Sequence, residues 1–224
     1  MCTPITGAEL AAATSSYARL LGRGATGEVF EGALRGAPIA VKRLKAPADA
    51  SPAILDALRR RFRAELTTLS AFRHPRIVRL LHACEDTGDA AHPLALVFEL
   101  LAGGSLADWL RSPVGAPAKR GALTPLQRID AALGVAHGLK YLHGLREPGE
   151  GGAQAPVVHR DVKSANVGFA LAGGGGELYA KVIDCVSSPQ LGGALAKPPP
   201  SAPPPKPPAS SSHPHPPPSH APTP

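Results

Sequence analysis

The stretch His159-Arg160-Asp161-Val162-Lys163-Ser164-Ala165-Asn166 carries the strongest signal in this chain of 224 residues. It combines a carboxylate, two cations and the only asparagine of the sequence. This set of groups suits phosphoryl transfer. A carboxylate orients an attacking hydroxyl and accepts its proton, a cation stabilises the moving phosphoryl group, and an amide oxygen binds Mg²⁺. The alternative interpretation is a basic loop that happens to contain one aspartate.

A glycine-rich run, Gly22-Arg23-Gly24-Ala25-Thr26-Gly27-Glu28-Val29, lies between two predicted strands. Glycines at these offsets let backbone N–H groups approach phosphate oxygens. An ordinary hairpin turn stays open as an alternative, because the chain contains 24 glycines and such spacing arises easily by chance. A dinucleotide-binding fold is disfavoured, since a strand and not a helix follows the glycines.

Two further charged residues, Lys42 and Glu65, have two interpretations each. Taken singly, Lys42 is an exposed residue of a predicted strand and Glu65 is a solvated carboxylate on a predicted helix. Taken together, the lysine reaches the α and β phosphates of a nucleotide, and the glutamate holds the lysine there through an ion pair.

Hydrophobic periodicity predicts an α+β fold, with a small β-rich lobe followed by a lobe that contains helices and a β-hairpin. Cap residues support the helix starts, with Ser51-Pro52 and Thr124-Pro125 as the clearest pairs. The predicted strands are 17–21, 28–33, 38–44, 77–83, 94–100, 167–171 and 178–183, and the predicted helices are 51–72, 105–110 and 124–143.

These motifs resemble the eukaryotic protein kinase family, most of all its receptor-like and interleukin-receptor-associated (tyrosine-kinase-like) serine/threonine branch. Lys163 after His-Arg-Asp is typical of the serine/threonine enzymes. Glu9-Leu10 with Ala13-Thr14 and Tyr17, His74-Pro75-Arg76-Ile77-Val78 and Gly103-Gly104-Ser105-Leu106 are similar to other family signatures. The resemblance covers about residues 9–186. It implies a bilobal kinase-like fold and transfer of a phosphoryl group from Mg²⁺-ATP to a protein serine or threonine.

The resemblance also implies a role for each matching residue. Asp161 and Lys163 would be catalytic, and Asn166 and Asp184 would bind Mg²⁺. Phe98 would be the gatekeeper, followed by a hinge from Glu99 to Leu101 that binds adenine. The residues implied to bind ATP are Leu21, Gly22, Gly24, Gly27, Val29, Ala40, Lys42, Glu65, Phe98, Glu99 and Leu101.

The expected organisation is a lead-in over 1–16, a small lobe and hinge over 17–101, a partial large lobe over 102–186 and a disordered proline-rich tail over 187–224. The chain departs from the family where it has Asp184-Cys185-Val186 instead of Asp-Phe-Gly, and at Gly168, where an apolar residue usually lies beneath adenine. Nothing after Val186 resembles an activation segment or the later helices. We therefore expect the apolar face of the 124–143 helix to be partly uncovered.

Residues 198–224 of the tail hold 14 of the 26 prolines. Its stretch Lys197-Pro198-Pro199-Pro200-Ser201-Ala202-Pro203 fits a ligand for an SH3 or WW domain. A plain disordered tail and a misplaced exon boundary are the alternatives. Three tail histidines, His213, His215 and His220, are expected to be solvated and not to bind metal.

Composition limits the setting of the protein. The formal net charge of +7 permits anionic partners, and no motif points to nucleic acid. Three widely spaced cysteines favour a reducing, cytoplasmic compartment, and no transmembrane segment is expected. Beside an active kinase, two functions stay open: a truncated pseudokinase that binds nucleotide or partners without catalysis, and a proline-rich adaptor.

Overall fold

The small lobe is organised around β6 (Leu94–Glu99), whose side chains alternate between the two faces of a sheet. Leu94 and Leu96 belong to the core on one face, whereas Ala95 and Val97 belong to the core on the other. All four are almost fully buried, with at most 2% of their surface exposed. The apolar sequence of this strand is therefore explained by a sheet that is covered on both sides.

The computed structural model describes residues 2–24, 27–111, 123–148, 154–172 and 177–185. Its main sheet has six strands, of which β1 runs parallel to β5 and the other neighbours are antiparallel. Their order is β1 (Thr3–Pro4), β5 (Leu80–Cys84), β6, β4 (Ala37–Leu44), β3 (Gly27–Leu34) and β2 (Leu20–Gly24).

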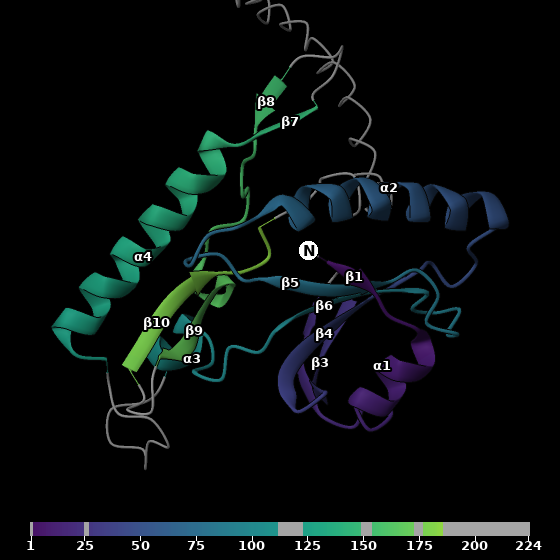
Figure 1. Cartoon of the computed structure of the whole chain (residues 1–224), viewed down its shortest axis with the longest axis horizontal. Coiled ribbons are helices and arrows are strands. Elements are labelled where there is room, and N and C mark those ends of the chain that lie inside the picture. Colours follow the sequence, from purple (N-terminus) through teal and green to yellow (C-terminus); the bar gives the residue numbers. More distant parts are fainter. Residues whose placement is uncertain (1, 25–26, 112–122, 149–153, 173–176, 186–224) are drawn as a thin grey trace, which may run out of the picture.

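Two helices cover the opposite faces of this sheet (Figure 1). The long helix α2 (Pro52–Ala71) begins at the Ser51 cap and packs Leu58, Phe62 and Leu69 into the first core. The short helix α1 (Gly7–Ala13) begins with a capping box between Thr6 and Glu9 and buries Leu10 in the second core.

The second lobe pairs helices with a hairpin. It contains α3 (Leu106–Arg111), α4 (Pro125–Gly144), the hairpin β9 (Val167–Ala172) and β10 (Glu177–Val182), and a short pair, β7 (Arg146–Pro148) with β8 (Gln154–Pro156). Small residues let α4 lie close to β10: a Cβ added at Gly138 would be 3.0 Å from both Arg76 O and Val182 Cγ2.

The outer face of α4 is apolar and exposed. Leu126, Ile129 and Leu133 keep 78%, 57% and 53% of their surface accessible. These residues follow helical spacing, so they form one stripe. The expectation of a partly uncovered apolar face on this helix is confirmed for the described residues. Among these residues, no helix is both long and apolar enough to cross a bilayer.

The segment between α2 and β5 joins the two lobes. The guanidinium of Arg76 lies 3.3 Å from Asp130 of α4 and 3.8 Å from the ring centroid of Tyr179 on β10. His74 stacks on Tyr141 of α4 with the ring centroids 4.8 Å apart. This segment therefore anchors the end of α2 to the second lobe.

Several predicted boundaries are wrong. Tyr17 lies in a turn with a φ of +62°, and the strand predicted at 17–21 begins only at Leu20 and continues through Gly24. The strand predicted from Ile77 begins at Leu80. The sequence pattern did not predict β1 or α1. The predicted turn at 173–176 and the proline-rich tail, with its SH3 or WW motif and three histidines, lie outside the described residues.

We expect Leu10→Ala to lower the free energy of unfolding by about 2–5 kcal/mol, because it leaves a cavity in a core where Leu10 is fully buried. Leu133→Ala is the matched control, since Leu133 is 53% exposed, and its effect should stay within about 0.5 kcal/mol. Urea denaturation of both variants measures the difference. Equal stabilities for the two variants would contradict the assignment of α1 to the core.

Candidate active site

The loop that contains Asp161 is tied to the end of β10 by a buried histidine. His159 is 1% exposed, and its Nε2 lies 2.9 Å from the carbonyl oxygen of Ile183. Its Nδ1 lies 3.3 Å from the backbone nitrogen of Asp161. Since the carbonyl only accepts and the backbone N–H only donates, a tautomer with the proton on Nε2 satisfies both contacts. Asn166 O accepts a further bond, at 3.0 Å, from the N–H of Ile183.

The carboxylate of Asp161 is held by two side chains of its own loop. Lys163 Nζ lies 2.6 Å from Asp161 Oδ2, and Asn166 Nδ2 donates to the same oxygen at 3.0 Å. Asn166 Nδ2 also bonds the backbone oxygen of Asp161 at 2.9 Å. The hydrogen bond from Lys163 is the main cause that lowers the pKa of Asp161 below its ordinary value. Asp161 is therefore an ionised carboxylate with a fixed orientation at neutral pH.

Lys42 of β4 pairs with Asp184 and not with Glu65. Its Nζ lies 2.6 Å from Asp184 Oδ1, whereas Glu65 Oε2 is buried without a hydrogen-bond partner. The predicted ion pair between Lys42 and Glu65 is thus wrong for this structure. Burial raises the pKa of Glu65 to about 7, and the charge of Asp184 adds to this effect while Lys42 opposes it. The lysine thus pairs with the more exposed of the two carboxylates, which loses less hydration in the contact.

Two oxygen-bearing side chains, those of Asn166 and Asp184, are the ones that the resemblance implies for Mg²⁺. The amide nitrogen of Asn166 bonds Asp161, which leaves Asn166 Oδ1 as the amide atom that could bind a metal ion. Asp184 has one oxygen on Lys42 and a second that this pair does not use. An amide and a carboxylate oxygen suit Mg²⁺, which takes few protein ligands and completes its shell with phosphate and water. Within the described residues, no cluster of three or more histidines, cysteines or acidic residues competes for a metal.

The glycine-rich segment forms the hairpin of β2 and β3. Gly22 lies opposite Val29, and Gly24 lies opposite Gly27. A Cβ at Gly27 would be 2.0 Å from Arg43 O, so glycine is required there by the packing of β3 on β4. The close contact with Arg43 O is enough to account for glycine at position 27, whether or not a phosphate binds. Gly22 and Gly24 are then the positions where the absence of a side chain would serve a ligand. Ala25 and Thr26, at the tip, lie outside the described residues.

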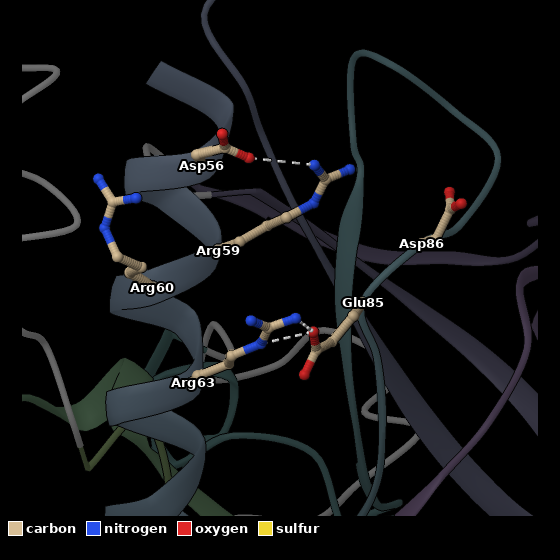
Figure 2. A pocket seen from close by; sticks show the side chains of 6 residues that line it. All are labelled: Asp56, Arg59, Arg60, Arg63, Glu85 and Asp86. Atoms are coloured by element: carbon tan, nitrogen blue, oxygen red, sulfur yellow. Dashed lines mark hydrogen bonds and ion pairs between the residues drawn. The ribbon is translucent and has the colours of Figure 1, made fainter. Parts of the chain in front are cut away.

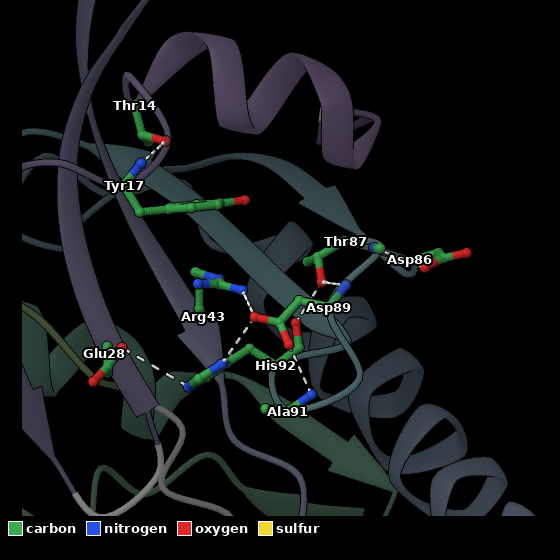
Figure 3. Close-up of polar contacts among 10 residues, drawn as sticks. Thr14, Tyr17, Glu28, Arg43, Asp86, Thr87, Asp89, Ala91 and His92 are labelled. Carbon is green, nitrogen blue, oxygen red and sulfur yellow. Dashed lines mark hydrogen bonds and ion pairs between the residues drawn. The ribbon is translucent and has the colours of Figure 1, made fainter.

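A polar network fixes the other side of this hairpin (Figure 3). Arg23 Nε lies 3.0 Å from Glu28 Oε1, and Glu28 Oε2 lies 3.8 Å from His92 Nε2. His92 is linked at 3.4 Å to Asp89, which also pairs with the buried guanidinium of Arg43. The network therefore ties β3 and β4 to the connection between β5 and β6.

The residues expected to line an adenine pocket lie on adjacent strands. Ala40 pairs with Phe98, and Val29 pairs with Lys42. Because side chains alternate along a strand, Ala40 and Lys42 project from the same face of β4. Leu21, on the outermost strand β2, is 45% exposed. The sheet therefore brings Val29, Ala40, Lys42 and Phe98 to one face.

The hinge makes two contacts that the sequence analysis missed. Glu99 Oε1 lies 2.6 Å from Lys181 Nζ on β10, and it accepts a hydrogen bond from the backbone nitrogen of Arg79 at 2.8 Å. The side chain of Leu101 lies against Gly168, where an added Cβ would be 2.4 Å from Leu101 Cδ1. Leu101 thus fills the place that an apolar residue at 168 would take. No local sequence pattern predicts the contacts of Glu99 with Lys181 and of Leu101 with Gly168, because each contact joins residues more than 60 positions apart.

We expect Glu65→Gln to stabilise the protein at pH 8 and to have little effect at pH 4. The pKa of Glu65 rises from 4.5 in the unfolded chain to about 7 in the fold, so the folded state holds the proton longer and loses relative stability as pH rises between these values. The full loss is about 3 kcal/mol at most. Urea denaturation at both pH values tests this, and a variant less stable than wild type at pH 8 would show that Glu65 belongs to a stabilising ion pair.

Comparisons with known proteins identify the family of this chain. Residues 16–190 match the protein kinase domain family. The chain is 37% identical to the serine/threonine-protein kinase VIK of Arabidopsis thaliana over 153 residues, which are 68% of this chain and 30% of that protein. It is 36% identical to the probable serine/threonine-protein kinase PBL28 of Arabidopsis thaliana, over 71% of this chain and 38% of that protein.

A third relative is the nodulation receptor kinase of Pisum sativum, 38% identical over 69% of this chain and 15% of that protein. The chain thus spans less than two-fifths of the length of these curated relatives. Among solved structures, an apo pseudokinase matches with a TM-score of 0.65 and 23% identity, over 84% of this chain and 61% of that one. The chain belongs to the protein kinase domain family and resembles its plant receptor-like serine/threonine members.

Proposed function

We propose that this protein transfers the γ-phosphoryl group of ATP to a serine or threonine hydroxyl of a protein substrate. The observation that carries the proposal is the carboxylate of Asp161, which is ionised, oriented by Asn166 and paired with Lys163 at 2.6 Å. This arrangement places a proton acceptor beside a cation, as phosphoryl transfer requires. The serine/threonine kinases among its relatives support the choice of hydroxyl.

Each residue of the site has a definite task in this proposal. Asp161 orients the attacking hydroxyl and accepts its proton, while Lys163 stabilises charge on the transferred group. Lys42 binds the α and β phosphates, and Asn166 and Asp184 hold Mg²⁺ through oxygen atoms. Bound Mg²⁺ supplies positive charge that neutralises the phosphate oxygens.

The nucleotide would bind between the sheet and the hinge. The backbone around Gly22, Gly24 and Gly27 would face the phosphates, while Leu21, Val29, Ala40 and Phe98 would line the adenine region. The hinge from Glu99 to Leu101 would provide backbone hydrogen bonds to the base. The contact of Leu101 with Gly168 supports this arrangement, because it offers an apolar surface where the sequence lacks one.

A second candidate function is nucleotide binding without phosphoryl transfer. The unpaired, buried Glu65 favours it, because the partner expected for Lys42 is not engaged. Cys185, which follows the metal-binding position, is 2% exposed, and burial raises the pKa of its thiol to about 12, so it is an inert apolar residue. The solved protein that shares this fold at a TM-score of 0.65 is itself a pseudokinase.

The cellular location and a partner for the tail are part of the same proposal. Cys2, Cys84 and Cys185 are all free thiols in the structure, which supports a reducing, cytoplasmic location. The proline-rich adaptor function would rest on residues outside the described part of the chain. Deletion of residues 198–224 without loss of any binding partner would rule the adaptor function out; the partner expected for it is an SH3 or WW domain protein.

We expect Asp161→Asn to reduce phosphate incorporation into a generic basic protein at least 100-fold, since it removes the proton acceptor and keeps the side-chain shape. Asp56→Asn is the matched control, because Asp56 is an exposed carboxylate of α2 on the pocket shown in Figure 2. Its rate should equal that of wild type. Incubation of the full chain with labelled Mg²⁺-ATP measures both.

Transfer that persists unchanged in Asp161→Asn would contradict the role of Asp161. No transfer by the wild type, together with a rise in melting temperature when Mg²⁺-ATP is added, would instead establish the second candidate, nucleotide binding without catalysis.

A further inference from the structure

A positively charged pocket of about 290 Å³ lies at the edge of the sheet formed by β1 and β5. It is lined by Thr3, Arg73, Arg79, Leu80, Leu81 and His82. Two arginines and a histidine contribute to this lining, and no acidic residue does. One wall comes from β1, which precedes the region matched by the kinase family. Thr3 is therefore a part of this pocket that lies outside the matched kinase region.

Thr3 presents its hydroxyl to this pocket. β1 runs parallel to β5, and Thr3 is in register with His82. Thr3 Oγ1 lies 2.7 Å from His82 Nδ1, while the residue itself is exposed. β1 is only two residues long, and the following residue, Pro4, has no N–H to add to the sheet. The hydroxyl is thus accessible on a short strand that opens at low cost.

The charge of the two arginines is not neutralised by carboxylates in the described part of the chain. Arg73 Nη1 donates to the backbone oxygens of Ser70 and Phe72, at 2.8 and 2.7 Å. The guanidinium of Arg79 has no hydrogen bond or ion pair among the described residues. Glu9 is the carboxylate that acts electrostatically on His82, but Thr6 holds its Oε2 at 2.8–2.9 Å.

A second pocket provides the contrast (Figure 2). It lies between α2 and the end of β5, has a volume of about 450 Å³, and is lined by Asp56, Arg59, Arg60, Arg63, Glu85 and Asp86. Its lining contains three arginines and three carboxylates, with Arg59 3.6 Å from Asp56 and Arg63 paired with Glu85. That pocket is electrically balanced, whereas the pocket at Thr3 has an excess of positive charge.

We propose that Thr3 is a phosphorylation site whose phosphate is bound by Arg73, Arg79 and His82. A phosphothreonine carries about −1.5 to −2 charges and three acceptor oxygens, which matches two guanidinium groups and an imidazole. A protein kinase would form a bond between Thr3 Oγ1 and the γ-phosphorus of ATP, break the bond from that phosphorus to the β–γ bridging oxygen, transfer the hydroxyl proton to its base and release ADP. The proposal does not depend on catalysis by this chain.

The bound phosphate would fasten the N-terminal segment to the sheet. It would connect β1 with both ends of the segment between α2 and β5, because Arg73 follows α2 and Arg79 precedes β5. Since Thr3 already lies in the pocket, a phosphate on it reaches the arginines at high effective concentration. A phosphate carried by another protein would have to bind without that advantage.

The test uses the full chain with phosphothreonine incorporated at position 3. A ³¹P NMR titration gives the second pKa of the phosphate, which is about 6 when the group is free. We expect this pKa to be lower by about 0.5–1 unit in the otherwise wild-type chain than in Arg73→Gln/Arg79→Gln, because the cations favour the dianion. We also expect a broad phosphatase to remove the phosphate at least fivefold more slowly from the otherwise wild-type chain than from Arg73→Gln/Arg79→Gln.

Two control variants test whether the effect is specific to the arginines of this pocket. Arg59→Gln/Arg60→Gln removes the same charge from the balanced pocket and should leave the pKa and the phosphatase rate unchanged. Arg73→Lys/Arg79→Lys retains the charge and should restore part of both effects, which distinguishes binding from a general loss of structure.

Equal pKa values and equal phosphatase rates in the wild-type and Arg73→Gln/Arg79→Gln backgrounds would overturn the proposal. It would also be overturned if phosphorylation at Thr3 left the phosphate pKa unshifted while a free phosphothreonine peptide bound the unmodified chain. That pattern would mean that the pocket receives phosphate from another protein.

Discussion

The ion pair between Lys42 and Asp184 connects the two lobes at the point where the chemistry would occur. Lys42 is fixed by the sheet, through the register of β4 with β3 and β6. Asp184 is fixed by the second lobe, through the bond of the preceding residue, Ile183, to Asn166. Lys42 Nζ lies 2.6 Å from Asp184 Oδ1, so the pair is a direct, charge-assisted contact between the sheet and the second lobe. The geometry of the whole site therefore depends on whether Lys42 pairs with Asp184 or with Glu65.

The partner of Lys42 influences the protonation of Glu65, beside the larger effect of burial. Glu65 comes from α2, so a pair between it and Lys42 would couple this helix to the sheet. In the present structure, Glu65 is buried without a hydrogen-bond partner on Oε2 and has a raised pKa. A buried carboxyl in this condition favours its neutral form, and the helix is held by packing at Phe62 and Leu69 instead. The hinge contact between Glu99 and Lys181 supplies a further polar link between the lobes.

The sequence named candidate residues for the site but did not give their pairing. The motif around Asp161 identified the acidic, basic and amide side chains, because their spacing within one loop leaves few arrangements. The positions of α2 and α4 followed from cap residues and apolar periodicity. Partners for Lys42, Glu99 and Leu101 depend on residues far away in the chain, and no local pattern encodes them. The elements β1 and α1 were missed because they are short, and the buried Leu10 is the main contact that reveals α1.

The most direct test of this account is a calorimetric titration of the full chain with Mg²⁺-ATP, with Lys42→Met and Asp184→Asn as comparisons. If Lys42 and Asp184 line the phosphate site, wild type binds the nucleotide and each variant weakens the affinity by about 10–100-fold, the value of one charge-assisted contact. Unchanged affinity in both variants, or no detectable binding by the wild type, would contradict the assignment of this site to nucleotide phosphate.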